Sequence, residues 1–117
     1  MTVIEFYTSI GVEFSDVKRR LGSEKIAQKF LKRIPDDPTY GMLKEAVAKK
    51  DKEEIFRGAH TLKGVALNLS VEPLAEAASD MTEMVRGDHT DVEGAIKKFA
   101  EVTAIYEDVV AKIAEID

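Results

Sequence analysis

Hydrophobic residues recur every three or four positions along most of the chain, whereas strict alternation of apolar and polar residues is scarce. The first spacing is that of amphipathic helices, so the pattern predicts an all-helical protein. Capping residues, glycines and prolines divide the pattern into segments. The first five predicted helices cover Val3–Ile10, Asp16–Leu21, residues 24 to about 34, Thr39–Lys49 and Lys52–Leu69. A sixth helix starts between Ser70 and Pro73 and ends at Gly87, and the last runs from about Asp91 to the C-terminus.

Capping signals set the helix boundaries in the first third of the chain. Ser15 and Ser23 are expected to cap the helices that follow them, and Gly22 is expected to end the helix between them. The segment Pro35–Pro38 stops the next helix, because proline lacks a backbone N–H and restricts the residue before it. We expect that helix to face inward through Ile26, Phe30, Leu31 and Ile34.

The segment from Lys52 to Leu69 has the most regular pattern. Asp51 and Glu54 are spaced as in a capping box at a helix N-terminus. Apolar residues then follow at spacings of four, three, four and three, which makes one continuous stripe along a helix of about five turns. The stripe consists of Ile55, Ala59, Leu62, Ala66 and Leu69.

Long amphipathic helices joined by short loops bury their apolar stripes only against one another. The economical arrangement is an antiparallel up-down four-helix bundle. We therefore predict an all-α fold, with the bundle at about 23–117 and short additional N-terminal helices at about 3–21. With 117 residues and no repeat or linker-like segment, the chain is predicted to be a single domain and, lacking linker-like tails, a free-standing protein.

Composition narrows the class of partner. The chain has 22 acidic and 17 basic residues, and a net charge of −5 disfavours nucleic acid and anionic lipid. It has no Cys, which excludes disulfides, thiolate nucleophiles and Cys-bearing zinc sites. The longest stretch without charge, Gly64–Val71, is far shorter than a spanning helix, and the N-terminus lacks the features of a signal peptide. We expect a cytoplasmic protein with a protein partner.

The informative residue is His60. It lies about 140° around the helix from the centre of the apolar stripe, so its ring is expected to face water. Arg57 and Lys63 lie three residues before and after it, and Gly64 lies four residues after it. This surrounding suits a phosphoryl group on an imidazole nitrogen, because imidazole is nucleophilic near neutral pH and nearby cations stabilise the added negative charge.

Two glycines interrupt this helix, and each lowers helix propensity by about 0.8–1.0 kcal/mol relative to Ala. Gly64 removes a side chain one turn from the His60 ring and leaves a gap for a partner's acceptor group. Gly58 lies near the edge of the apolar stripe, where close packing between helices explains it better.

Simpler interpretations remain open at this point. A surface histidine with a lysine three residues away is common, and Lys63 and Arg57 are individually typical of solubilising charges. Phe56 and Leu67 flank the His60 sector but fit equally well as residues at the edge of the core. A metal site would need further ligands, and the second histidine, His89, lies in the turn at 87–90, where we expect a solvated loop residue.

The run from Ala59 to Leu69, with the pattern H-x-L-K-G from His60 to Gly64, resembles the signature of histidine-containing phosphotransfer (Hpt) domains. The resemblance extends over about residues 11–88. The segments that carry it outside the signature are Gly11–Phe14, Arg20–Gly22, Lys29–Leu31, Pro73–Ala78 and Val85–Asp88. Ser70 departs from the pattern, since relatives commonly have glycine there. A left-handed helix end is therefore less expected, and Ser70 is expected to cap the next helix.

The resemblance implies a phosphorelay intermediate of two-component signalling, a phosphoprotein that moves phosphoryl groups between aspartates of receiver domains. It implies that His60 is phosphorylated on Nε2, that Lys63 stabilises the phosphoryl group and that Gly64 is the access gap. Phe56, Arg57 and Leu67 would form the receiver docking surface. The partners would be response-regulator receivers and a hybrid sensor kinase, and Mg²⁺ would come from the receiver, with no cofactor or metal bound by this chain.

Three functional classes compete. In the first, the chain is a phosphocarrier without an ATP site of its own. In the second, it is an autokinase, which its length and its lack of nucleotide-binding motifs disfavour. In the third, it is a non-catalytic Hpt-like module that binds receivers or kinases as an adaptor, which the complete set of His60, Lys63 and Gly64 disfavours. A closed bundle with an exposed site favours a monomer.

Overall fold

The structure is a computed structural model, and it describes residues 1–88 and 90–117. Its regular elements are helices, as the hydrophobic pattern predicts. In chain order they are α1 (Val3–Ser9), α2 (Phe14–Leu21), α3 (Glu24–Leu31), the 3₁₀ helix η1 (Ile34–Asp36), α4 (Thr39–Ala48), α5 (Lys52–Asn68), α6 (Glu72–Met84) and α7 (Val92–Ala114). The predicted all-α class is confirmed.

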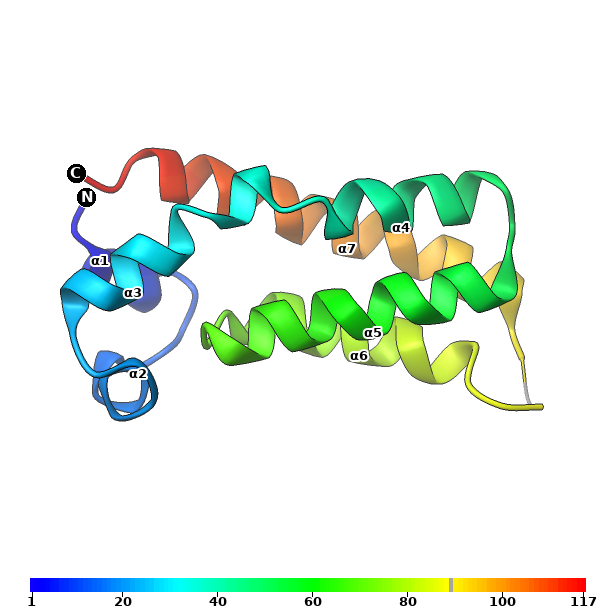
Figure 1. Cartoon of the computed structure of the whole chain (residues 1–117), viewed down its shortest axis with the longest axis horizontal. Helices are drawn as coiled ribbons and strands as arrows, with labels where there is room; N and C mark the ends of the chain where they lie inside the picture. The colour runs from blue at the N-terminus through cyan, green and yellow to red at the C-terminus, as the bar shows by residue number, and fades with distance from the viewer. Residues whose placement is uncertain (89) are drawn as a thin grey trace.

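The four longest helices, α4 to α7, extend along the long dimension of a molecule that measures 41 × 23 × 19 Å (Figure 1). Successive helices run in alternate directions, and α5 packs against both α4 and α6, whereas α7 packs against α6. The short helices α1, α2 and α3 pack against one another at the end where α5 finishes. The described helices include none that is long and apolar enough to cross a membrane.

Aromatic residues join α4 to α7. The rings of Tyr40 and Tyr106 lie face to face, with centroids 4.0 Å apart and planes inclined by 4°. Phe99 stacks on the same Tyr40 ring at 5.7 Å, and the Tyr40 hydroxyl is 2.9 Å from the hydroxyl of Thr103. Stacked rings bury large apolar area with defined geometry, so they hold α4 against α7.

Two predicted boundaries shift by a few residues. Helix α2 begins at Phe14 with Glu13 as its N-cap, so the prediction that Ser15 caps it is wrong. Helix α3 has Ser23 as its N-cap, as predicted, but it ends at Leu31, before the predicted end near residue 34. The chain then forms η1, because proline fits the first turn of a helix, where no N–H is needed.

The inward face of α3 differs from the prediction. Ile26 is 43% exposed and Phe30 is half-buried, whereas Ala27 and Leu31 are fully buried. The predicted inward residues Leu31 and Ile34 are buried. The prediction is wrong at Ile26, and Ala27 takes its place on the buried face. Alanine gives a weak hydrophobic signal, which explains why the sequence pattern favoured its larger neighbour.

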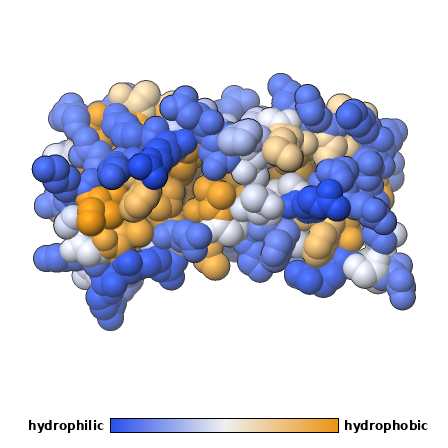
Figure 2. Space-filling model, in the orientation of Figure 1, coloured by the Kyte–Doolittle hydropathy of each residue, from blue (hydrophilic) through white to orange (hydrophobic). Residues whose placement is uncertain are grey.

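An apolar hollow lies between α3, η1 and the last turn of α5, and Figure 2 shows this apolar area on the same side of the molecule as Figure 1. Leu21 from α2 closes one side of it. Its other apolar lining residues are Phe30, Ile34, Val65 and Leu69. The N-terminal helices thus cover the end of α5 only in part.

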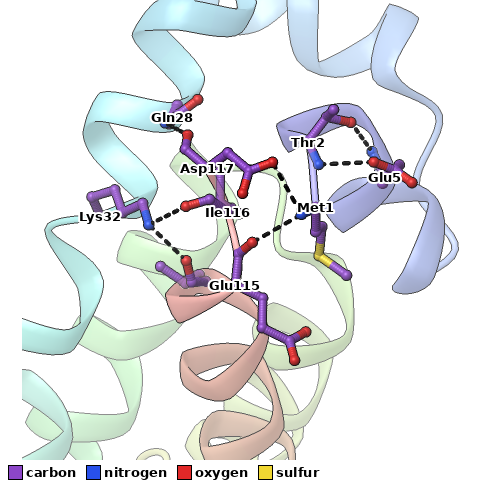
Figure 3. Close-up of polar contacts among 9 residues, drawn as sticks. Met1, Thr2, Glu5, Gln28, Lys32, Glu115, Ile116 and Asp117 are labelled. Atoms are coloured by element: carbon purple, nitrogen blue, oxygen red, sulfur yellow. Dashed lines mark hydrogen bonds and ion pairs between the residues drawn. The ribbon is translucent and has the colours of Figure 1, made fainter.

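The C-terminal end of α7 is tied to α3 and to the N-terminal segment (Figure 3). Lys32 donates hydrogen bonds to the carbonyl oxygens of Ile113 and Ile116, at 2.9 and 2.7 Å. The backbone N–H of Asp117 donates to the carbonyl oxygen of Met1 at 3.0 Å. The last carbonyls of a helix lack partners within the helix and carry partial negative charge, so a lysine is a favourable cap there.

Candidate functional site

Helix α5 carries the candidate site and is anchored at its start. The Asp51 side chain accepts a hydrogen bond from the backbone N–H of Glu54 at 3.2 Å, as predicted. The carboxylate of Glu54 accepts from Arg57 at 2.7 Å, so its interaction is with the next turn and not with the N-cap backbone of a full capping box. The predicted apolar stripe is buried from Ile55 to Ala66, and its last member, Leu69, is half-buried.

His60 lies on the exposed side of α5, as its position in the pattern predicts. Its imidazole stacks on the ring of Phe56, one turn earlier, with centroids 5.9 Å apart and planes inclined by 2°. Within the described part of the chain, no hydrogen bond involves this imidazole. Its ring plane is thus defined by an aromatic neighbour while its edge is open to a partner.

Lys63 and Gly64 follow His60 by about one turn. Lys63 is partly exposed, and no ion pair with it forms among residues 1–88 and 90–117. A Cβ atom added to Gly64 would meet nothing within 4 Å, whereas one added to Gly58 would lie 3.2 Å from both backbone and side-chain atoms of Leu43 in α4. The prediction that Gly58 serves close helix packing is confirmed. Nothing in the described chain requires glycine at position 64.

The three candidate docking residues differ in their surroundings. Leu67 is 46% exposed, which argues against a place in the core. Phe56 is half-buried and packs against the core with part of its ring. The Arg57 side chain is 68% exposed and pairs with Glu54, so its charge is already partly neutralised within α5. A leucine with this much exposure, about two turns after an exposed histidine on the same helix, is an available contact surface.

The site includes residues that the sequence reasoning missed. Arg86, just after α6, places its guanidinium carbon 5.3 Å from the centroid of the Phe56 ring. Its Nε donates to both carboxylate oxygens of Glu83, at 2.9 and 3.1 Å. Lys52 donates to the carbonyl oxygen of Gly87 at 2.6 Å and so ties the start of α5 to the turn after α6. The contacts of Arg86 with Phe56 and of Lys52 with Gly87 join α5 to the segment that follows α6, and helical periodicity gives no signal for them.

The end of α5 corrects one prediction. Ser70 adopts a left-handed conformation with φ of +57°, and Val71 is the N-cap of α6, without a side-chain cap. The N–H groups of Ser70 and Val71 donate to the carbonyl oxygens of Leu67 and Ala66, at 3.1 and 2.9 Å. These two bonds form a Schellman motif with serine at the position usually taken by glycine. The prediction that Ser70 caps the next helix is wrong.

No group of three or more His, Asp or Glu side chains that could hold an ion occurs among the residues that the structure describes. The prediction that His89 is a solvated loop residue lies outside the described residues. The exposed edge of the His60 ring leaves a ring nitrogen accessible, so the geometry favours nucleophilic attack by that nitrogen on a group of a partner.

Comparison with known proteins agrees with this geometry. The family model of the Hpt domain matches residues 25–112, which include all of α4, α5 and α6. Neither the comparison with curated proteins nor that with solved structures found a match. Hpt domains act in histidine phosphotransfer of two-component systems, as phosphocarrier modules that interact with response-regulator receiver domains. From the match over most of its length, the chain belongs to the Hpt domain family.

Proposed function

We propose that this protein is a phosphorelay intermediate, which accepts a phosphoryl group on His60 from the aspartate of one receiver domain and passes it to the aspartate of another. One observation carries the proposal. The His60 imidazole is exposed on α5, and the backbone one turn further on, at Gly64, has open space where a side chain would otherwise project. A partner's acceptor group therefore has an approach to the ring.

The proposed transfer is balanced without a further reactant. The lone pair of His60 Nε2 attacks phosphorus, the P–N bond forms, and the P–O bond of the aspartyl phosphate breaks. The receiver's carboxylate leaves with the electron pair, and the imidazole keeps its proton on Nδ1. The reverse steps deliver the group to the next aspartate. Such transfer depends mainly on positioning and neutralisation of charge, which an exposed imidazole beside a lysine and an open approach can supply.

The neighbouring residues take separate roles in this proposal. Lys63, one turn after His60, supplies the positive charge that stabilises the phosphoryl oxygens. Gly64 lets the receiver's active site approach. Leu67 and Phe56 supply apolar contact to the receiver, and Arg57 supplies a charge at the edge of that contact. The Mg²⁺ that assists transfer belongs to the receiver, and this chain contributes no ligand to it.

The scaffold of this proposal is an antiparallel up-down four-helix bundle of α4 to α7. The chain acts as one Hpt domain over residues 1–117, as a cytoplasmic monomer and phosphoprotein, with receivers and a hybrid sensor kinase as partners. Packing of α5 between α4 and α6 supports the monomer, because the helix that carries His60 is covered on both sides by helices of the same chain.

The test is incubation with phosphorylated receiver domains, followed by acid treatment of any label acquired by the chain. We expect label that is lost in acid, as a phosphoramidate is, and no label on the His60→Gln variant. Label from ATP alone would instead indicate an autokinase. Binding of receivers without any transfer of label would contradict the relay and favour the adaptor.

A further inference from the structure

A run of contacts leads from α6 to the reactive ring. Glu83 binds Arg86 through both carboxylate oxygens, at 2.9 and 3.1 Å. The Arg86 guanidinium carbon lies 5.3 Å from the Phe56 centroid, within the range of a cation–π contact. Phe56 in turn lies parallel to His60, with centroids 5.9 Å apart and planes inclined by 2°. The His60 imidazole is thus the exposed end of this run of contacts, and the opposite end, Glu83, lies on α6.

We propose that Phe56 is a positioning residue for the His60 imidazole, and that Arg86, held by Glu83, fixes the Phe56 ring. This inference rests on the proposed function of His60 and adds to it, because it gives Phe56 a role in the transfer step itself, besides any contact with the receiver.

The physical need for such a residue follows from the exposure of His60. An exposed side chain rotates freely about its last torsion angle, and each rotation moves the nitrogen lone pair away from the line of attack on phosphorus. Parallel rings at this separation attract each other through offset stacking, which favours one plane for the imidazole. No hydrogen bond within the described chain provides that restraint, so the stack is the contact that can supply it.

The position of Phe56 makes it suitable as a fixed support. It lies four residues before His60 on the same helix, so the two side chains are neighbours on one face. Part of its ring packs against the core, which limits its own rotation. Arg86 contacts it from beyond the end of α6, and the two-oxygen bond to Glu83 restricts the guanidinium in turn.

The test compares Phe56→Leu, which keeps apolar volume but removes the ring, with Phe56→Tyr, which keeps the ring, and with Arg86→Gln. Arg19→Gln is the matched control, since Arg19 also pairs with a carboxylate three residues away but lies on α2. The first readout is the pattern of NOEs from the His60 ring protons to its own Cβ protons and to α5 in the unphosphorylated protein, which reports the orientation of the ring. The second is the transfer rate at saturating phosphorylated receiver. Circular dichroism verifies that each variant is folded.

We expect Phe56→Leu to change the NOE pattern of the His60 ring and to lower the saturating rate by about two- to tenfold. Phe56→Tyr keeps the ring and should change the NOE pattern and the rate less than Phe56→Leu does, Arg86→Gln should change the NOE pattern by less, and Arg19→Gln should not change it. An unchanged NOE pattern of the His60 ring, or an unchanged saturating rate, in folded Phe56→Leu would overturn the proposal. If the wild-type chain accepts no phosphoryl group, the proposed function fails, whereas the NMR comparison still decides whether Phe56 orients the ring.

Discussion

The two glycines of α5 lie on faces of the helix with opposite demands. At Gly58 the neighbouring helix α4 is so close that a Cβ would lie 3.2 Å from Leu43, whereas at Gly64 a Cβ would meet only open space. The first glycine is explained by contacts within the molecule. The second has no such explanation and lies one turn from an exposed histidine. The comparison teaches that a residue unfavourable for the fold, with no internal contact to justify it, points to an external partner.

The largest expected effect is the loss of phosphoryl acceptance when His60, on the exposed face of α5, is replaced. His60→Gln should abolish phosphoryl acceptance, because the amide side chain lacks a nucleophilic ring nitrogen, and it should leave the free energy of unfolding nearly unchanged, because the position is exposed. Transfer of label from a phosphorylated receiver and urea unfolding measure the two quantities. Thr61→Ala, a change at the next exposed residue, is the control and should keep acceptance. Label on the His60→Gln variant would remove His60 from the reaction.

A change at Gly58, on the face of α5 that packs against α4, should lower stability and leave phosphoryl transfer unchanged. Gly58→Val places a branched side chain against Leu43 and should lower the free energy of unfolding by about 1–3 kcal/mol through overpacking. Urea denaturation measures the loss. At temperatures where this variant stays folded, its rate of phosphoryl transfer should match that of the wild type. A stability equal to the wild type would mean that α4 and α5 separate readily.

Lys63→Ala tests the charge on the open face. Removal of the ammonium should slow transfer by about tenfold, because the phosphoryl oxygens lose a stabilising cation. The fold should be unaffected, since no ion pair of Lys63 forms within the described residues. Single-turnover transfer from a labelled receiver gives the rate, and Lys97→Ala, on α7, is a control for loss of one positive charge elsewhere. An unchanged rate would exclude Lys63 from the site.

Tyr7 tests the packed end of α5, and its effect depends on pH. Its buried hydroxyl donates to the carbonyl oxygen of Leu69 at 2.7 Å, and Tyr7→Phe should lower stability by about 1–2 kcal/mol at pH 8. Burial raises the pKa of Tyr7 above its usual value. Above about pH 10 the unfolded phenol ionises while the folded one stays neutral, so the wild type loses stability through Tyr7 as pH rises and the Tyr7→Phe variant does not. The difference between the two proteins should therefore shrink, and urea unfolding at pH 8 and 10.5 that shows a constant difference would contradict this.

The smallest expected effect has opposite signs for fold and function. Gly64→Ala should raise the free energy of unfolding by about 0.8–1.0 kcal/mol, the helix propensity gained where the added methyl group meets no other atom. It should slow phosphoryl transfer, because the methyl group occupies the approach to His60. Thermal unfolding and transfer assays on the same preparation measure both. A faster transfer than that of the wild type would refute the role of Gly64 as an access gap.

The sequence predicted those features that depend on local periodicity and capping. The course of α5, its Asp51 cap, the outward place of His60 and the packing role of Gly58 all follow from spacing along one helix. The orientation of α3 was predicted wrongly at Ile26, because small Ala27 gives less hydrophobic signal than the isoleucine beside it.

Features that depend on contacts between segments were beyond the reach of the pattern. Arg86 is distant in sequence from Phe56, and only the packing of α6 beside α5 brings them together. Ser70 was expected to avoid a left-handed conformation, which disfavours residues other than glycine by about 1–2 kcal/mol. The two Schellman hydrogen bonds, together with the bond of Tyr7 to Leu69, offset that penalty. The contact of Arg86 with Phe56 and the hydrogen bond of Tyr7 with Leu69 both depend on residues distant in sequence, so the local pattern does not predict them.

The tyrosine pair between α4 and α7 provides an intrinsic optical probe of this fold. The chain has three Tyr and no Trp, and Tyr40 and Tyr106 lie with their rings 4.0 Å apart. Chromophores stacked this closely couple their electronic transitions, so we expect this contact between α4 and α7 to contribute to the near-ultraviolet circular dichroism of the protein. Separation of α4 from α7 during unfolding is therefore measurable without an attached label.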